Sequence, residues 1–150
     1  MSETQYRSLR TASVLFLAGF VLHNADHARR GLSAIHDEVV WSGTFVAVVA
    51  AVTLTLVFTR HAAAPLAATA TGFATAAGVS ASHLLPTWSA LSDSLPDGNV
   101  DGWTWVAVLA EIVGALVLGA AGLRVLRHPA SPTARSSADS VGRSMSSGRR

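Results

Sequence analysis

The sequence predicts an all-α integral membrane protein, a bundle of four transmembrane helices followed by a disordered C-terminal tail. Half of the 150 residues are hydrophobic and only 13% are charged, whereas roughly 25% of the residues in an average soluble protein are charged. Four windows of about 20 mostly apolar residues are each long enough to cross a hydrocarbon core of ~30 Å. None of them alternates apolar and polar residues, so helices are expected rather than membrane strands.

The first window, residues 8–28, begins with an apolar run, residues 11–22, and ends in polar residues. The run covers only about 18 Å at 1.5 Å per residue, so a complete crossing draws these polar residues into the outer part of the membrane. Arg7 and Arg10 precede the run. Basic residues before a short apolar run are also typical of a cleaved signal peptide, which would leave a protein with three spans.

The other three windows differ in composition. Residues 39–59 contain neither a charged residue nor a histidine and form the clearest span. Residues 62–85 are rich in Ala, Thr and Gly, which is typical of a helix that packs tightly against its neighbours in a membrane. Residues 103–123 are apolar except for Thr104 and Glu111. We therefore expect a four-span transmembrane domain over residues 1–128.

Residues 129–150 have a different composition, rich in serine and arginine and without an apolar run. Such a segment cannot bury enough apolar surface to offset its conformational entropy, so a disordered cytoplasmic tail is predicted. Its arginines can interact with anionic lipid head groups, or the tail can simply help to fix the topology.

The arginines near the ends of the windows predict the orientation. Short cytoplasmic loops retain positive charge, and most of these arginines lie before the first window, between the second and third, and after the fourth. We therefore expect both termini in the cytoplasm and two outward loops, residues 29–38 and 86–102, which hold most of the acidic residues. Four tryptophans near the outer ends fit an interfacial aromatic belt: Trp41, Trp88, Trp103 and Trp105.

The composition also excludes several classes of site and suggests a location. Without cysteine, the chain has no disulfide, no thiolate metal site and no cysteine nucleophile. All 11 basic residues are arginine, so a Schiff-base or Walker lysine is excluded. No dinucleotide or P-loop fingerprint occurs, and no nucleic-acid partner is expected. The lysine-free, alanine- and arginine-rich composition is typical of high-GC bacteria, which predicts a multi-pass protein of the plasma (inner) membrane.

Ionisable residues are expected to meet in the outer half of the bundle. His23 and His27 lie one turn apart on one helix face, and such residues within a span usually face the bundle interior. Glu111 lies about 12 Å along the fourth window, at a depth comparable with His23 because the two spans run in opposite directions. His83 lies near the outer end of the third window. We therefore expect these four side chains to converge, and the loop 86–102 can lie over them as a lid.

Two histidines at a spacing of four residues are a common way for a helix to supply two ligands to one metal ion. His83 or Glu111 would then supply a third ligand. Nitrogen and oxygen ligands leave zinc, iron, copper and manganese as candidates, and a haem b held by one histidine of the first span and His83 is a second possibility. Three further residues are candidates to orient an imidazole by hydrogen bonding: Asp26, Asn24 and Ser80.

The string HNADH, residues 23–27, resembles the H-x-x-E-H pattern of inverzincin metalloproteases. The resemblance covers five residues and departs from the pattern at Asp26, where the family has the glutamate that acts as general base. Aspartate is one methylene shorter and does not reach the same water molecule. A metallopeptidase is therefore not the function that we expect.

Two classes of function, and a third possibility, follow from the polar cluster. In the first, the chain is a structural or accessory membrane subunit, the cluster only stabilises packing, and a strip of small residues around Gly72, Ala76 and Ser80 binds another membrane protein or a second copy. In the second, the cluster binds a metal ion or haem for redox or hydrolytic chemistry. A proton path, a quinone or another small ligand is the third possibility. The sequence leaves open whether the protein is an enzyme.

Overall fold

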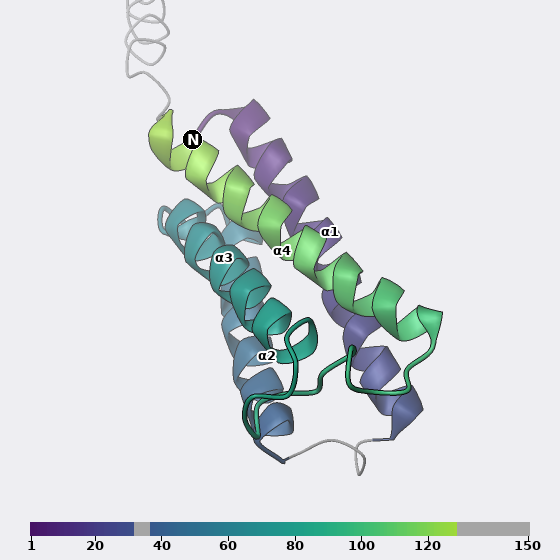
Figure 1. Ribbon diagram of the computed structural model, residues 1–150. Helices are drawn as coiled ribbons and strands as arrows, with labels where there is room; N and C mark the ends of the chain where they lie inside the picture. Colours follow the sequence, from purple (N-terminus) through teal and green to yellow (C-terminus); the bar gives the residue numbers. More distant parts are fainter. Residues whose placement is uncertain (32–36, 129–150) are drawn as a thin grey trace, which may run out of the picture.

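The computed structural model describes residues 1–31 and 37–128, and these residues form four helices and no strand (Figure 1). The predicted tail and residues 32–36 of the first predicted outward loop lie outside the described residues. Each helix covers most of one apolar window. The bounds of the helices are α1 Glu3–Arg30, α2 Asp37–Phe58, α3 Ala64–His83 and α4 Gly102–Arg127.

Local signals in the sequence account for where α1 and α4 begin. The side chain of Ser2 accepts a hydrogen bond from the backbone N–H of Gln5, whose side chain accepts from the N–H of Ser2, so α1 begins with a capping box. Asp101 caps α4 by accepting from the backbone N–H of Thr104. Helix α1 ends at Gly31, whose φ of 94° is a backbone conformation that glycine adopts without strain.

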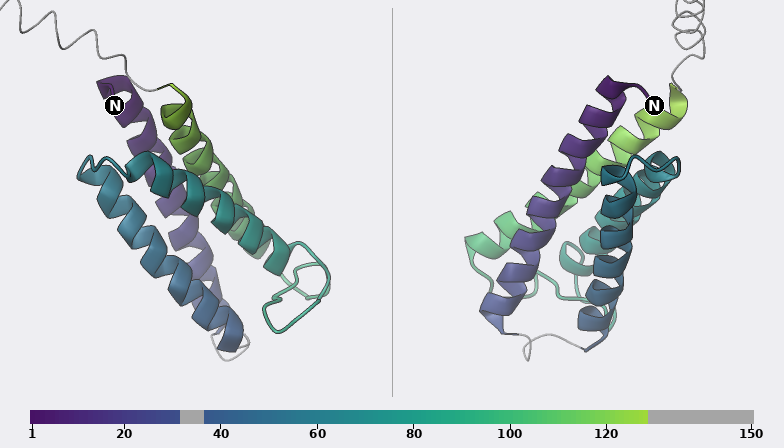
Figure 2. Two further views of the ribbon diagram at one scale, coloured as in Figure 1. Left: turned by 90° about the vertical axis from the view of Figure 1, so that its left-hand side faces the viewer. Right: turned by 180° about the vertical axis from the view of Figure 1, so that it is seen from behind.

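Successive helices run in opposite directions, so the N-terminus of α1 lies beside the end of α4 (Figures 1 and 2). Helix α4 packs along both α1 and α3, whereas α2 packs less extensively, mainly against α3. The ends of α1 and α3 and the beginning of α4 therefore lie at one end of the bundle, next to the connection between α3 and α4 (Figure 1). This arrangement brings together the parts of the chain that carry the predicted polar site.

Glycines allow α4 to approach its two neighbours closely. A Cβ atom on Gly19 of α1 would lie 2.5 Å from the carbonyl oxygen of Ala110, and one on Gly72 of α3 would lie 2.3 Å from the backbone nitrogen of Gly119. No side chain fits in either place without moving the helices apart. At Gly72, the strip that we considered as a surface for another protein therefore packs against α4 of the same chain.

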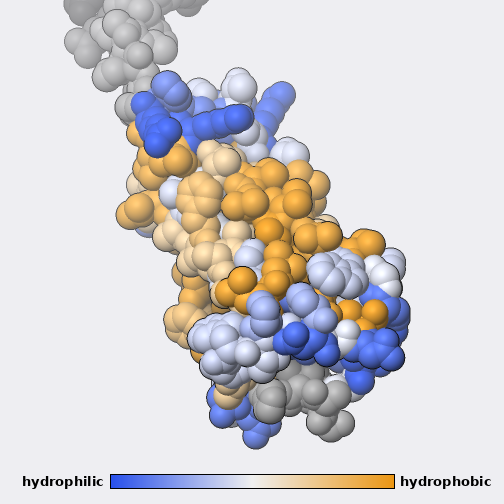
Figure 3. All heavy atoms as spheres, in the orientation of Figure 1, coloured by the Kyte–Doolittle hydropathy of each residue, from blue (hydrophilic) through white to orange (hydrophobic). Residues whose placement is uncertain are grey.

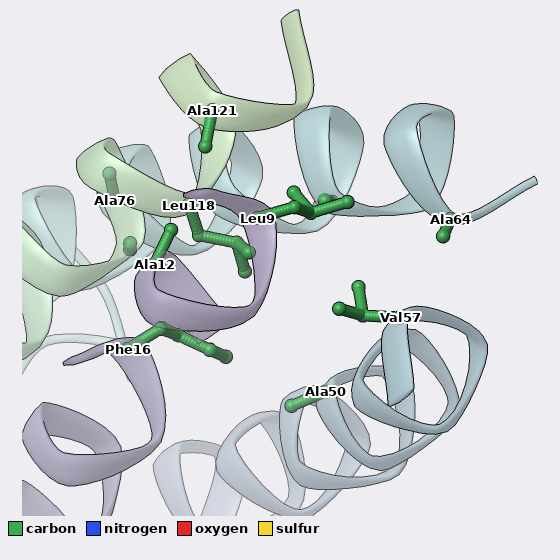
Figure 4. Close-up of a cluster of buried hydrophobic side chains, with 11 residues drawn as sticks. Leu9, Ala12, Phe16, Ala50, Val57, Ala64, Ala76, Leu118 and Ala121 are labelled. Carbon is green, nitrogen blue, oxygen red and sulfur yellow. The ribbon is translucent and has the colours of Figure 1, made fainter. Parts of the chain in front are cut away.

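The largest cluster of buried apolar side chains lies in the half of the bundle away from the predicted polar site. Leu9 and Phe16 of α1 pack with Leu118 of α4, and Val57 of α2 closes this cluster (Figure 4). A second, smaller cluster lies under the connection between α3 and α4 and contains Leu95, Val108 and Ile112. The polar site thus lies beside packed apolar regions that fix the helices.

Two of the four helices, α2 and α4, are long and apolar enough to cross a membrane. This finding supports only part of the prediction, because α1 and α3 do not meet the same criterion. Arginine, histidine and asparagine lower the mean hydropathy of α1, and the many Ala, Thr and Gly residues lower that of α3. Only 17% of the apolar window of α2 is buried, against 56% of that of α4.

Figure 3 shows hydrophobic residues gathered between two hydrophilic ends.

Candidate metal centre

Three histidines from two helices meet at the end of the bundle where α1 and α3 end. His23 and His27 lie in the last two turns of α1, and His83 is the last residue of α3. The ring centroid of His23 lies 4.5 Å from that of His27 and 4.7 Å from that of His83. The centroids of His27 and His83 are 5.6 Å apart. His23 and His83 are buried, and His27 is half-buried.

The spacing of the ring nitrogens is close to that of a metal site. One nitrogen from each of the three rings can be chosen so that all lie within 4.8 Å of one another. Two nitrogens bound to one ion at ~2.1 Å can be at most about 4.2 Å apart. Side-chain shifts of under ~1 Å therefore suffice to bring the three imidazoles around a single ion.

The imidazole of His23 is oriented by Glu111, which lies in the third turn of α4. Nδ1 of His23 is hydrogen-bonded to Oε2 of Glu111, and both side chains are buried. We assign the proton to Nδ1, because a carboxylate oxygen only accepts a hydrogen bond. Nε2 of His23 then carries a lone pair, and it is buried without a hydrogen-bond partner among the described residues. Because buried acceptors are rarely left unpaired, this atom is available to accept a hydrogen bond or to bind an ion.

His83 is held in the same manner by a backbone group. Its Nδ1–H donates to the carbonyl oxygen of Asp93 at 2.9 Å, which leaves Nε2 as the free lone pair. His23 and His83 thus each use Nδ1 for an orienting hydrogen bond, one to a carboxylate and one to a backbone carbonyl. This is the arrangement that metal-ligating histidines almost always show.

His27 is the weakest of the three candidate ligands. Its Nδ1 accepts a hydrogen bond from the guanidinium of Arg30 at 3.0 Å. Because arginine only donates, Nε2 of this neutral imidazole carries the proton. An ion can bind His27 only after Arg30 releases Nδ1, or with the loss of the Nε2 proton, since metal binding requires a free lone pair.

The structure places the two acidic candidates, Glu111 and Asp26, in different positions beside the histidines. Glu111 lies against Nδ1 of His23 and outside the group of three potential ligand residues, so in this arrangement it orients the ring of His23. Asp26 is fully buried, but it pairs with Arg29 at 2.8 Å and Arg30 at 3.2 Å rather than with an imidazole. Both residues therefore belong to the surroundings of the histidines.

The other two residues proposed to orient an imidazole do not do so. Asn24 donates to the carbonyl of Phe20 on its own helix. Ser80 makes no side-chain hydrogen bond within the part of the chain that the structure describes. The orienting group that the sequence did not suggest is the carbonyl of Asp93, ten residues after His83. A loop carbonyl has no recognisable sequence pattern, because every residue has one.

The connection between α3 and α4 is tied to the histidine cluster by several hydrogen bonds. The backbone N–H groups of Asp93 and Leu95 donate to the carbonyls of Ser82 and His83, at 3.0 and 2.9 Å. Burial alone would raise the pKa of Asp93, but the guanidinium of Arg30 at 2.6 Å holds that pKa below its usual value. The loop therefore packs on the end of α3 and links it to the end of α1.

A cavity of about 750 Å³ lies beside the cluster, between α1, α2 and α3. One part of its wall is polar and contains His23, His27, His83 and Glu111. Most of the remaining wall consists of apolar or small side chains of α2 and α3. An ion held by the histidines would therefore lie at the edge of a cavity large enough for a small molecule.

The ring geometry distinguishes between the two kinds of cofactor. With metal–nitrogen bonds of ~2.0 Å, two axial imidazoles on opposite faces of a haem have their ring centres about 6 Å apart. The rings of His23 and His83 are instead in direct edge-to-face contact, with centroids 4.7 Å apart. No macrocycle fits between them, so the contact of His23 with His83 favours a single ion over a haem held by this pair. The rings of His27 and His83, the other pair from the first span and α3, are 5.6 Å apart.

Comparison of the chain with protein-family models, with curated proteins and with solved structures gives no match. A proposal on function therefore depends on the geometry and the chemistry of the site itself.

Proposed function

We propose that this chain is a small integral membrane protein that holds one divalent transition-metal ion between His23, His27 and His83. The observation that carries the proposal is the pair of buried imidazoles of His23 and His83. Each has Nδ1 engaged by an orienting partner and Nε2 free, and Nε2 of His23 has no partner among the described residues. Three nitrogen ligands leave a fourth position for water or for a ligand in the cavity.

Several features support the membrane part of this proposal. Helices α2 and α4 are apolar enough to span, and α1, with 28 residues, is about 42 Å long. All four helices expose large apolar side chains between the hydrophilic ends of the molecule (Figure 3). Examples, one from each helix, are Leu15, Phe45, Leu66 and Val113. Because water solvates such a surface poorly, we propose a four-span bundle in the plasma (inner) membrane with cytoplasmic termini.

The ligand set suggests which ions fit and what they would supply. Imidazole nitrogens suit zinc, iron, copper and, less well, manganese. A bound ion with an open position acts as a Lewis acid, or lowers the pKa of a bound water molecule. The protein residues contribute the orientation, since Glu111 and the Asp93 carbonyl fix the two buried rings. We use zinc as the probe ion, because its chemistry includes no redox change.

The second candidate function is a structural or accessory membrane subunit, and a specific contact favours it. The buried His23–Glu111 pair joins α1 to α4, and Arg30 joins Asp26 to Asp93 at the end of α1. Such contacts contribute ~0.6 to 2 kcal/mol each to packing within a membrane, without any ion. Under this alternative, loss of a histidine lowers stability and changes nothing else.

Metal analysis decides between the two functions. We expect wild type, purified in mild detergent and loaded with zinc, to retain about one ion per chain, and His23→Ala and His83→Ala to retain none. His61→Ala is the matched control, because His61 is exposed and lies in the connection between α2 and α3, at the other end of α3 from His83. Wild type that retains no zinc after loading overturns the proposal and favours the structural function. A haem absorption band in the visible spectrum would also contradict it.

A further inference from the structure

The cavity beside the histidines lies on the side of the bundle where α2 packs loosely, whereas α4 packs closely against α1 and α3. A Cβ atom on Gly19 or Gly72 would overlap the backbone of α4, whereas a Cβ atom on Gly43 of α2 or Gly78 of α3 would have nothing within 4 Å. Both of these open glycines line the cavity. The space therefore comes from small residues on two facing helices, at the same end of the bundle as the histidines.

The walls of the cavity indicate an apolar ligand body. Apart from the cluster, the lining comes mostly from apolar or small residues, among them Phe20, Val39, Phe45, Val46, Val79 and Leu91. A volume of about 750 Å³ is within the range of ~300 to 1,000 Å³ of small-molecule sites. Such a wall stabilises a ligand by removing its apolar surface from water or from competing lipid contacts.

The charges around the polar end indicate a neutral head group. With a divalent ion in place, the positive charges of the ion, Arg29 and Arg30 balance the negative charges of the surrounding carboxylates. These carboxylates are Asp26, Asp93, Asp101 and Glu111, and each of them is paired with an arginine or a histidine of the cluster. A charged head group would therefore upset a balanced site, whereas a hydroxyl or carbonyl oxygen would not.

We infer that the cavity binds a neutral amphiphile, an apolar chain or ring body with a hydroxyl or carbonyl oxygen, and that this oxygen is directed at the histidine cluster. The inference rests on the proposed function, because the oxygen takes the coordination position that the three histidines leave open. Lipid-soluble alcohols and quinones share this chemistry. The ligand body lies between α2 and α3, in the space left by Gly43 and Gly78.

Trp88 provides a reporter for binding. Its side chain lies at the edge of the cavity, where its indole N–H donates to the carbonyl of Ala81 at 2.9 Å. Bromine quenches tryptophan fluorescence on contact, and Trp88 lies at the histidine end of the cavity. Undecanol with a bromine on the carbon next to the one that carries the hydroxyl is therefore a suitable probe. A Trp88→Phe variant identifies the part of the signal that comes from this residue. Bromoundecane and bromoundecanoic acid are matched probes, one without the oxygen and one with a charged head group.

The experiment uses the zinc-loaded full chain in lipid nanodiscs. We expect bromoundecanol to quench Trp88 saturably and to bind about tenfold more tightly than either matched probe, as one added coordination or hydrogen bond would give. Gly43→Leu should abolish saturable quenching and keep the zinc, because leucine fills the cavity without touching a histidine. Ala51→Leu, on the same helix but outside the cavity, should change neither property.

Each other outcome overturns the inference and leaves the proposed function separately testable. Equal binding of bromoundecane shows that only lipid chains enter the cavity, and tighter binding of the acid contradicts a neutral head group. Identical quenching in wild type and Gly43→Leu places the probe elsewhere. Exclusion of the probe at every concentration, with dimers detected by cross-linking, shows that a second copy fills the cavity. Zinc content is measured in the same samples, and its absence from wild type contradicts the proposed function instead.

Discussion

Glu111 shows how one side chain gains its role from its partner. A carboxylate in an apolar helix is costly, so such residues face the interior and are paired. Glu111 is buried against Nδ1 of His23. This pairing leaves Nε2 as the free ring nitrogen of His23, and Glu111 itself lies outside the group of potential ligand residues. The orientation of the His23 ring, and which of its nitrogens is free, therefore depends on a residue 88 positions away in the sequence.

Glu111→Gln is expected to weaken zinc binding about 10- to 100-fold, the usual effect of removing a partner that orients a metal ligand. Glutamine has nearly the same shape and its amide oxygen still accepts from Nδ1–H, so the fold should persist. Competition with a chelating dye measures the zinc affinity, and circular dichroism checks the helix content. Unchanged affinity together with a lower melting temperature would show that the His23–Glu111 pair serves packing alone.

Asp97 is hydrogen-bonded within the connection between α3 and α4. Its carboxylate accepts from the backbone N–H of Thr87 at 2.6 Å and from the Thr87 hydroxyl at 2.9 Å, and these hydrogen bonds hold the pKa of Asp97 below its usual value. A carboxyl group of this kind stabilises the folded loop above its ordinary pKa of about 4, and the contribution is lost as the pH falls through the lowered value.

We therefore expect faster amide hydrogen exchange at Thr87 when the pH is lowered below about 4, after correction for the intrinsic rate. Asp97→Asn should remove this pH step, because the amide side chain does not titrate in this range. Thr87→Val removes the hydroxyl but keeps the backbone donor, so a smaller step should remain. A step of the same size in Asp97→Asn would assign the pH dependence to another group.

At the scale of the helices, the contact between α1 and α4 determines whether the cluster forms. Gly19 of α1 lies directly against the backbone of Ala110 and Glu111. His23 is one turn farther along α1, so the close approach at Gly19 brings its ring within reach of the Glu111 carboxylate. The helix that carries two of the histidines is thus held in place by a residue that has no side chain.

Gly19→Ala should lower stability by ~1 to 3 kcal/mol, the usual cost of overpacking, and should reduce zinc retention because α1 moves away from α4. Gly43→Ala is the matched control, since it makes the same change on a helix face where a Cβ atom meets nothing within 4 Å. The control should be neutral or slightly stabilising, as alanine favours a helix over glycine. Thermal unfolding and zinc content measure both effects, and equal behaviour of the two variants would contradict the prediction.

At the scale of the whole molecule, the distribution of charge predicts a direction across the membrane. The end formed by the histidines and the loop carries Asp93, Asp97 and Asp101, whereas the opposite end carries five of the seven arginines in the described part of the chain. Figure 3 shows the hydrophilic surface concentrated at these two ends. In the proposed orientation, the metal centre opens toward the outer face.

Single cysteines can test this orientation, because the native chain has none. Asn99→Cys in the outer loop should react in intact cells with a maleimide that does not cross membranes, and Thr4→Cys near the start of α1 should react only after the cells are opened. Both positions are exposed. The reverse pattern would invert the orientation, and labelling of both positions in intact cells would contradict the three spans, α1, α2 and α3, that the proposal places between Thr4 and Asn99.

Much of the helical layout could be predicted from the sequence. The apolar windows locate the four helices because each helix needs a long apolar stretch, and their ends follow from caps such as Ser2 and Asp101. The spacing of His23 and His27 placed both rings on one face. The all-α class is confirmed for the described residues, but only α2 and α4 are apolar enough to support the predicted spans.

The sequence by itself determined which helices form and at what depth along them His23, His83 and Glu111 lie, because rise per residue and apolar length are local properties. The tertiary structure alone decided how these side chains are used. Close packing at Gly19 and Gly72 sets the rotation of each helix about its axis, and the path of the loop brings the Asp93 carbonyl to His83. These contacts join residues distant in the chain, so no local pattern reveals which ring nitrogens are free or that a cavity lies beside them.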